Sequence, residues 1–247
     1  MTVSNLLKST NFELAFLSAV NLMVNISSYI DHTFLKPVAR HTDIKKICDE
    51  AMHYQFAAVC IPPTLVAYTK RLLQESDIKI ATVVGFPFGY SVASAKISEA
   101  MQAIDDGADE LDVVINLISL KNGDWRSLEN EMKEISGLIH GRSRIIKVII
   151  ESGALTDDEI VSCCSMYGRM SVDFLKTSTG YFEKGATIEV VRLMRQHLPA
   201  NVRIKASGGI RNYAFARQLI EAGASRLGCS SSVVIVEEEL SLETRLK

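Results

Sequence analysis

Short apolar runs and amphipathic segments alternate along most of the chain. From residue 29 onward, runs rich in β-branched residues recur, and each is followed by a stretch with apolar residues at helical spacing. Runs such as ATVVGF (81–86) and IIKVII (145–150) are nearly continuously apolar, which is typical of strands in a parallel sheet covered on both faces. The predicted strands are 29–33, 56–61, 79–86, 111–116, 144–151, 174–177, 202–206 and 226–228. The predicted helices are 42–54, one opened by Pro62 and Pro63, 92–106, 125–140, 157–167, 187–197, 212–222 and 231–239.

Eight strand–helix units without a break in composition favour one domain over two. A closed (β/α)8 TIM barrel has this number of units and about this length. An open doubly wound sheet more often shows a GxGxxG segment at its switch point, and the sequence has none. We therefore predict a single barrel over residues 29–247, preceded by an extension, residues 1–28, that we expect to form an extra N-terminal helix.

Charge and cysteine content narrow the classes of function. The 27 basic and 29 acidic residues show no electrostatic signature for nucleic acid or for an anionic membrane, so neither is expected as a partner. The five cysteines include no CxxC pair, which favours a reducing compartment. The apolar stretch 12–24 lacks a cationic leader and is too short to cross a bilayer. We expect a cytoplasmic protein.

Three lysines lie inside predicted strands, where lysine is uncommon. Lys147, Lys176 and Lys205 fall on the fifth, sixth and seventh strands, and Asp112 falls on the fourth. A single strand lysine is usually one whose amino group reaches solvent at the barrel end. Because the carboxyl ends of barrel strands converge, three such lysines beside an aspartate indicate a common site.

Converging lysines have a chemical use. An isolated lysine, with a pKa of about 10.4, is almost entirely protonated at neutral pH and is a poor nucleophile. A neighbouring ammonium lowers its pKa and raises the neutral fraction, and a neutral amine attacks a carbonyl to form a Schiff base. This chemistry also needs a group that moves protons, and Asp112 is the nearest carboxylate candidate.

Small residues follow the last three strands. They occur in Thr177–Gly180, Ser207–Gly209 and Gly228–Ser231, where backbone N–H groups can approach an anion closely. Turns explain any single glycine pair, but loops in register with neighbouring strands indicate a phosphorylated ligand. Arg211 could pair with its phosphate or be solvated at a helix start.

The sequence resembles deoxyribose-phosphate aldolase, a family of class I Schiff-base aldolases. The matching segments run in order through the chain outside its N-terminal extension, and the pair KTSTG and KASGGIR is the most specific. They are IDHTFLKP (30–37), VVGFP (83–87), GADELDVVIN (107–116), KVIIE (147–151), DFLKTSTG (173–180), IKASGGIR (204–211) and GASRLG (223–228).

The resemblance implies a role for each candidate residue. Lys176 would form the Schiff base, Asp112 would donate and accept protons, Lys205 would transfer protons and lower the pKa of Lys176, and Lys147 would be auxiliary. The substrate phosphate would bind the backbone groups of Gly180, Gly208, Gly209, Ser230 and Ser231. The reaction implied is reversible cleavage of 2-deoxy-D-ribose 5-phosphate to D-glyceraldehyde 3-phosphate and acetaldehyde, in deoxynucleoside catabolism. It implies no metal or organic cofactor, and a homodimer.

Departures from the family pattern concern rate and substrate breadth. The last tyrosine is Tyr213, so the tail tyrosine of many members is missing, and Cys229 stands where threonine is common. Cys60 ends the second strand and either faces the pocket or is a small buried hydrophobe. Two alternatives remain. One is a different Schiff-base sugar-phosphate aldolase, and the other is a sugar-phosphate-binding barrel without chemistry, against which the retained lysines and Asp112 argue.

Overall fold

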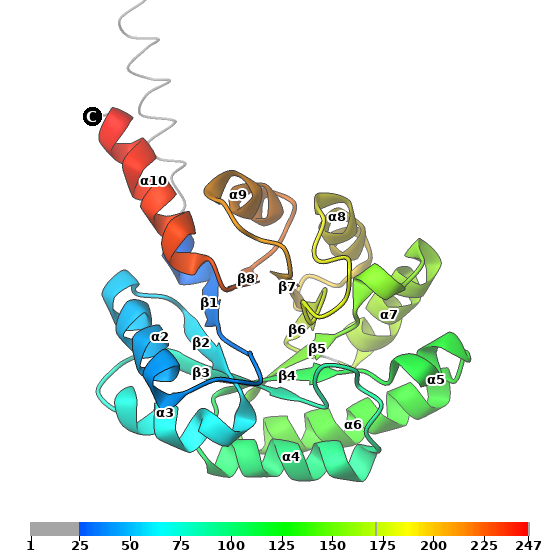
Figure 1. Cartoon of the computed structure of the whole chain (residues 1–247). Coiled ribbons are helices and arrows are strands. Elements are labelled where there is room, and N and C mark those ends of the chain that lie inside the picture. Colours follow the sequence, from blue (N-terminus) through cyan, green and yellow to red (C-terminus); the bar gives the residue numbers. More distant parts are fainter. Residues whose placement is uncertain (1–24, 171, 247) are drawn as a thin grey trace, which may run out of the picture.

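The computed structural model describes residues 25–170 and 172–246, and these form a closed barrel of eight parallel strands (Figure 1). Each strand pairs with its neighbours in chain order, and β1 closes the sheet against β8. The strands are β1 (Ile30–Thr33), β2 (Ala58–Ile61), β3 (Lys79–Val84), β4 (Glu110–Val114), β5 (Ile145–Ile149), β6 (Phe174–Lys176), β7 (Arg203–Ser207) and β8 (Arg226–Cys229). The predicted (β/α)8 barrel is confirmed.

Helices surround the barrel and connect successive strands, as a parallel sheet requires. They are α2 (His41–Tyr54), α3 (Val66–Leu72), α4 (Ala93–Asp105), α5 (Leu117–Lys121), α6 (Trp125–Gly141), α7 (Asp157–Arg169), α8 (Ile188–His197), α9 (Tyr213–Glu221) and α10 (Ser232–Leu246). Short 3-10 turns are η1 (Ile26–Tyr29), η2 (Pro63–Leu65) and η3 (Ser152–Ala154).

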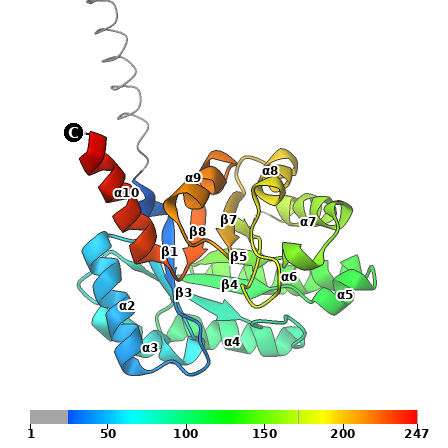
Figure 2. The ribbon, with the colours of Figure 1, turned by 45° about the horizontal axis from the view of Figure 1, so that its top comes forward.

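The predicted boundaries differ from the structure where a polar side chain caps a helix. The fourth strand was predicted to reach Asn116, but β4 ends at Val114, and the Asn116 side chain accepts hydrogen bonds from the backbone of Ile118 and Ser119. This cap starts α5, which the apolar pattern did not predict. At the other end of the chain, α10 continues to Leu246 instead of ending at residue 239, and it projects beyond the barrel in both views (Figures 1 and 2).

The inner face of the barrel has an apolar side and a charged side. The main hydrophobic core lies between the outer face of the sheet and the helices. A separate small cluster of Ala58, Cys60, Ala81 and Val83 lines the interior along β2 and β3. Because strand residues alternate between faces, charged residues of β1 and of β4 to β8 point into the same interior. The charged side chains that could take part in polar chemistry therefore lie on one side of the interior only.

The N-terminal extension, predicted as residues 1–28, falls mostly outside the described residues, so its helix stays a prediction. Of the described part, Ile26 is buried in the core and its backbone N–H donates to the carboxylate of Glu239 on α10, at 3.3 and 3.4 Å. Among the described residues, no helix combines the length and the apolar composition needed to cross a membrane.

Candidate active site

The three strand lysines lie side by side in the barrel interior. Lys176 on β6 pairs in register with Lys205 on β7, and Lys147 on β5 pairs with Asp112 on β4. Lys147 and Lys205 are fully buried, and Lys176 is 3% exposed. The structure therefore brings together the four residues that the sequence singled out as catalytic candidates.

Asp112 is the common partner of the three ammonium groups. Its Oδ1 lies 2.9 Å from Nζ of Lys147, and its Oδ2 lies 2.7 Å from Nζ of both Lys176 and Lys205. A single carboxylate oxygen thus bridges the amino groups of Lys176 and Lys205. A proton can pass among these groups without large movement of any side chain.

Three further charged residues complete this cluster. Asp31 on β1 forms ion pairs with Lys205 and with Arg226, the latter at 2.6 Å. Glu110 contacts Lys147 at 2.5 Å and Arg226 at 3.2 Å. No role was predicted for Asp31, Glu110 or Arg226 from the sequence. The available signal was their position: Glu110 and Arg226 stand two residues before Asp112 and Gly228, on the same face of their strands.

The charges of this cluster balance only when one lysine is neutral. Its basic members are Lys147, Lys176, Lys205 and Arg226, and its acidic members are Asp31, Glu110 and Asp112. Four cations against three carboxylates leave one uncompensated positive charge in a buried site. Burial disfavours such a charge, so the cluster favours loss of one proton.

Of the three clustered lysines, Lys176 is the one whose pKa is lowered. Burial lowers the pKa of Lys176 most, Asp112 opposes that effect, and the ammonium of Lys205 adds to the lowering. A neighbouring ammonium was the predicted cause of the lowered pKa, but in the structure desolvation lowers it more than Lys205 does. The amine of Lys176 therefore has a larger neutral fraction than an exposed lysine.

The neighbours of Lys176 keep their charges. Burial also disfavours the ammonium groups of Lys147 and Lys205, but Asp112 and a second carboxylate beside each outweigh this, and both pKa values are raised. Burial disfavours the carboxylate of Asp112, but the three lysines outweigh it and hold its pKa well below the usual range. Lys176 is thus the amine of the cluster that loses its proton most readily, beside a carboxylate and two cations.

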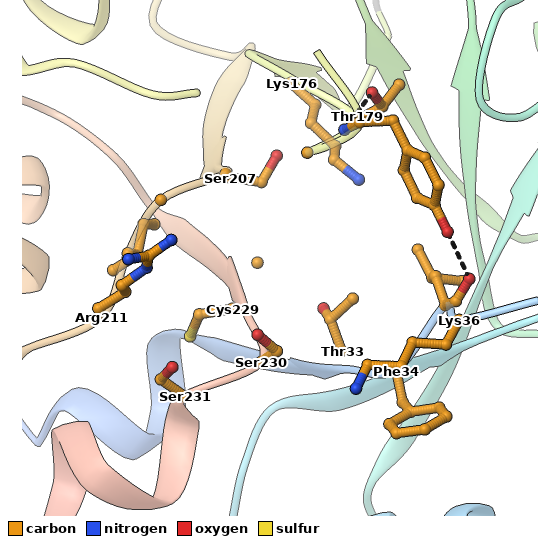
Figure 3. A pocket seen from close by; sticks show the side chains of 17 residues that line it. Thr33, Phe34, Lys36, Lys176, Thr179, Ser207, Arg211, Cys229, Ser230 and Ser231 are labelled. Atoms are coloured by element: carbon orange, nitrogen blue, oxygen red, sulfur yellow. Dashed lines mark hydrogen bonds between the residues drawn. The ribbon is translucent and has the colours of Figure 1, made fainter. Parts of the chain in front are cut away.

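A cavity of about 390 Å³ opens above Lys176 (Figure 3). Its lining includes all five residues predicted to bind phosphate, together with Arg211 and the loop after β1. Those five residues are Gly180, Gly208, Gly209, Ser230 and Ser231. In the close view, the Lys176 amino group points into the space bounded by Ser207, Arg211 and Ser230. The cavity thus joins a buried amine to loops suited to an anion.

The loop after β7 depends on glycine. Gly208 and Gly209 have φ values of 88° and 79°, which side chains with a Cβ rarely adopt. A Cβ on Gly185 would also stand 2.3 Å from the carbonyl oxygen of Gly208, so the loops after β6 and β7 pack backbone to backbone. Both Gly208 and Gly209 line the cavity at this point.

Glu151 anchors the loop after β6. Its buried carboxylate accepts hydrogen bonds from the Thr179 backbone N–H, at 3.2 Å, and from the Thr179 hydroxyl. Burial raises the pKa of Glu151, and the hydrogen bonds from Thr179 offset only part of this effect. Thr179 lines the cavity next to Gly180, so this contact holds that part of the wall in place.

Cys60 points into the barrel interior but does not line the cavity. It is fully buried in the apolar cluster on β2 and β3, and burial raises the pKa of its thiol. Within residues 25–170 and 172–246, histidine, cysteine and acidic side chains form no group of three that could hold a metal ion.

This chain is similar in structure and in sequence to known aldolases. Among solved structures, an aldolase designated QR15 superposes with a TM-score of 0.86 at 36% identity and covers 91% of this chain and 100% of its own. Fold and structural relatives together define a (β/α)8-barrel aldolase, a carbon–carbon lyase. The sequence profile of the DeoC/LacD family aldolases matches residues 26–231. The chain belongs to this family.

Individual relatives agree along nearly their whole length. Deoxyribose-phosphate aldolase of Caldicellulosiruptor saccharolyticus is 48% identical over 215 residues, covering 87% of this chain and 98% of the relative. That of Thermococcus gammatolerans is 47% identical over 216 residues, covering 87% and 96%. The deoxyribose phosphate aldolase of Aeropyrum pernix, described as tetrameric, superposes with a TM-score of 0.82 at 31% identity, covering 88% and 92%.

Proposed function

We propose that this chain is a class I aldolase that reversibly cleaves 2-deoxy-D-ribose 5-phosphate to D-glyceraldehyde 3-phosphate and acetaldehyde. One observation carries the proposal. Lys176, a buried amine with a lowered pKa, lies at the inner end of a cavity whose outer walls are glycine and serine loops. The relatives named deoxyribose-phosphate aldolase support the choice of substrate.

The reaction begins at Lys176. Its neutral amine adds to the C1 aldehyde of the open-chain sugar, and the resulting carbinolamine loses water to give an iminium ion. The iminium carries the same positive charge that a protonated Lys176 would carry. Asp112, 2.7 Å from the amine before reaction, is placed to stabilise that charge as it forms.

Cleavage of the C2–C3 bond follows. The bond's electron pair moves into the iminium and produces an enamine of acetaldehyde on Lys176. The C3 hydroxyl loses its proton and becomes the aldehyde of glyceraldehyde 3-phosphate. Asp112 accepts this proton through a water molecule, because its low pKa keeps it ionised before the step. Protonation of the enamine carbon and hydrolysis of the second iminium release acetaldehyde and restore Lys176.

Lys205 and Lys147 assist without forming the imine. Lys205 shares an oxygen of Asp112 with Lys176, so it lowers the pKa of the nucleophile and can exchange a proton through Asp112. Lys147 holds the other oxygen of Asp112 and fixes the orientation of the carboxylate. Its ion pair with Glu110 also fixes the position of the Lys147 amino group.

The substrate phosphate binds at the loops after β6, β7 and β8. Backbone groups of Gly180, Gly208, Gly209, Ser230 and Ser231 surround it, and the Arg211 guanidinium lines the same cavity. Binding of the phosphate there orients C1 toward Lys176. The binding energy of the phosphate thus serves to position the reacting carbon.

The cellular setting follows from the same resemblance. The reaction belongs to deoxynucleoside catabolism, and we place it in the cytoplasm. We also propose that the chain forms a homodimer. The tetrameric description of the Aeropyrum pernix relative supports self-association without supporting that number of subunits. Sedimentation of the purified chain tests the assembly.

Borohydride trapping tests the proposed reaction. The protein is treated with acetaldehyde or deoxyribose 5-phosphate, reduced, digested and mapped by mass spectrometry. A two-carbon adduct on Lys176 is expected, and it should disappear in Lys176→Met but persist in Lys70→Met, which removes an exposed lysine of α3. An adduct on Lys147 or Lys205 would overturn the assigned roles. A folded protein without any adduct would favour a sugar-phosphate-binding barrel without chemistry.

A further inference from the structure

The cavity above Lys176 occupies only one side of the barrel mouth. Its lining residues follow β1, β6, β7 and β8, and none of them comes from β2, β3, β4 or β5. The excluded side includes the apolar interior cluster of Ala58, Cys60, Ala81 and Val83. Two residues of the cavity wall connect it to this side, Leu35 directly and Tyr181 through Phe86.

Tyr181 has the larger of these two side chains. It follows Gly180 in the loop after β6, and its hydroxyl donates a hydrogen bond to the backbone oxygen of Leu35, 2.9 Å away, in the loop after β1. Its ring meets the ring of Phe86 edge to face, with centroids 5.3 Å apart and planes at 90°. One side chain thus connects the loops after β6, β1 and β3 across the mouth.

The partners of Tyr181 contact the apolar side. Both Leu35 and Phe86 pack against the interior cluster that contains Cys60 and Val83, and Leu35 also lines the cavity. Tyr181 itself lines the cavity and is 50% exposed. Its ring therefore has the cavity on one side and Phe86, with the apolar cluster, on the other.

The anchoring of Tyr181 differs between its backbone and its ring. The backbone N–H donates to the Thr179 hydroxyl at 3.1 Å, and that hydroxyl is itself held by the buried Glu151. The ring is held by one hydrogen bond and one aromatic contact. A substitution that shortens the side chain therefore removes the partition and leaves the loop's anchor in place.

We propose that Tyr181 is a specificity-determining residue, which confines aldehyde substrates to the side of the mouth with the phosphate-binding loops. This inference rests on the proposed aldolase function. Without the ring, the volume that it fills adds to the cavity above Lys176, and Phe86 becomes part of the cavity wall. The enlarged site accepts acceptor aldehydes that carry an aliphatic chain in place of a phosphate.

The gain depends on the polarity of the acceptor chain. Each methylene that leaves water for an apolar surface improves binding about three- to fourfold. The binding of an aliphatic acceptor to the enlarged site therefore improves with the length of its chain. A phosphorylated acceptor keeps its place at Gly208, Gly209 and Arg211 and gains nothing from the apolar side.

The experiment compares acceptors in the synthetic direction, with acetaldehyde as donor. For each variant, kcat/KM is measured with hexanal and with glyceraldehyde 3-phosphate, and their ratio is the readout. Tyr181→Ala removes the partition, and Tyr181→Phe removes only the hydroxyl. Phe182→Ala is the matched control, because Phe182 is the adjacent, similarly exposed aromatic residue and does not line the cavity.

Y181A is expected to raise the hexanal to glyceraldehyde 3-phosphate ratio at least about tenfold, and Y181F by less. F182A is expected to leave the ratio unchanged. A merely structural role of Tyr181 would lower both values in proportion, and an unchanged ratio in Y181A would overturn the proposal. An equal rise in F182A would overturn it as well.

Two further measurements separate this proposal from the proposed function. If acetaldehyde forms no adduct on Lys176 in the unsubstituted chain, the aldolase mechanism fails, whatever Tyr181 does. The partition is then tested by a crystal structure of Y181A. A cavity that extends to Phe86 and Val83 supports the partition, and movement of Phe86 into the vacated space overturns it.

Discussion

Gly228 on β8 makes room for the side chain of Lys205 on β7. A Cβ at position 228 would lie 3.0 Å from Cε of Lys205 and equally far from Cβ of Ser207. Such a contact is closer than ordinary van der Waals packing, so one of these groups would have to move. Because residue 228 has no side chain, the Lys205 amino group can reach the oxygen of Asp112 that it shares with Lys176.

Gly228→Ala is expected to reduce kcat about tenfold and to cost about 1–3 kcal/mol of stability through overpacking. The displaced Lys205 amino group would no longer bridge Asp31 and Asp112. Steady-state kinetics and urea denaturation give the two quantities. Gly137→Ala is the control, since no atom lies within 4 Å of a Cβ built there. Unchanged kcat in G228A would show that the position of Lys205 is not critical.

Lys205→Met is expected to raise the pKa of Lys176, because the substitution removes a cation that lowers it. The neutral amine is the reactive form, so the acid limb of the kcat/KM profile should move to higher pH. Loss of activity should be largest at neutral pH, about 100-fold, and smaller in alkaline buffer. A pH profile of both proteins checks this. An acid limb that moves to lower pH would contradict the electrostatic role of Lys205.

Asp112→Asn is expected to separate imine formation from turnover. Asp112 raises the pKa of Lys176, so its removal favours the neutral amine and the acetaldehyde adduct should still form. Turnover should fall about 10²–10⁴-fold, because the proton acceptor is gone. Borohydride trapping and kcat are measured on the same preparation, with circular dichroism to check folding. Equal loss of adduct and of turnover would argue against a proton-transfer role.

Arg211→Gln is expected to raise KM for deoxyribose 5-phosphate about tenfold, the effect of losing one charge-assisted hydrogen bond. Arg211 lines the cavity but makes no contact with the lysine cluster, so kcat should stay within about twofold. Trapping of acetaldehyde on Lys176 should be unaffected. If KM for unphosphorylated deoxyribose rises equally, Arg211 does not act through the phosphate.

Glu239 links stability to pH at a distance from the active site. Burial raises its pKa to about 7 from an ordinary value of 4.5. Folding therefore favours the protonated form, and this stabilisation is complete below pH 4.5 and is lost as pH rises through 7. Relative to the unsubstituted chain, Glu239→Gln should gain about 3 °C in Tm between pH 5 and pH 8. Calorimetry at both pH values checks this.

The exposed Leu240 provides the control for that measurement. It lies on the same helix and has no titratable group, so Leu240→Gln should show the same Tm difference from the unsubstituted chain at both pH values. A pH-independent difference for Glu239→Gln as well would contradict the assignment of the raised pKa.

Local patterns predicted much of the fold because the pleat and the helical turn have fixed periods. The strands that carry Lys147, Lys176 and Lys205 were recognised from apolar runs, and their order implied a barrel. Prediction was weaker where local chemistry ended a strand early. Asn116 reads as the end of an apolar run, yet its side chain caps α5 instead.

The candidate site was predicted in part. Asp112 and the glycine loops were singled out because a polar residue stands out within an apolar strand and small residues stand out after one. Arg226 and Glu110 were missed, since a charged residue at the start of a strand usually faces solvent. Tyr181 was missed because nothing near it in sequence indicates a contact with Leu35, 146 residues away.

The sequence by itself determined the order of elements, the strand on which each lysine lies and the loops that contain glycine. These follow from interactions between residues close along the chain. Only the tertiary structure decided that Lys176 and Lys205 share one oxygen of Asp112, and that Asp31 reaches Lys205 across the closure of β1 on β8. The pKa of Lys176 falls because the closed barrel buries it among those charges, and burial is a property of the whole fold.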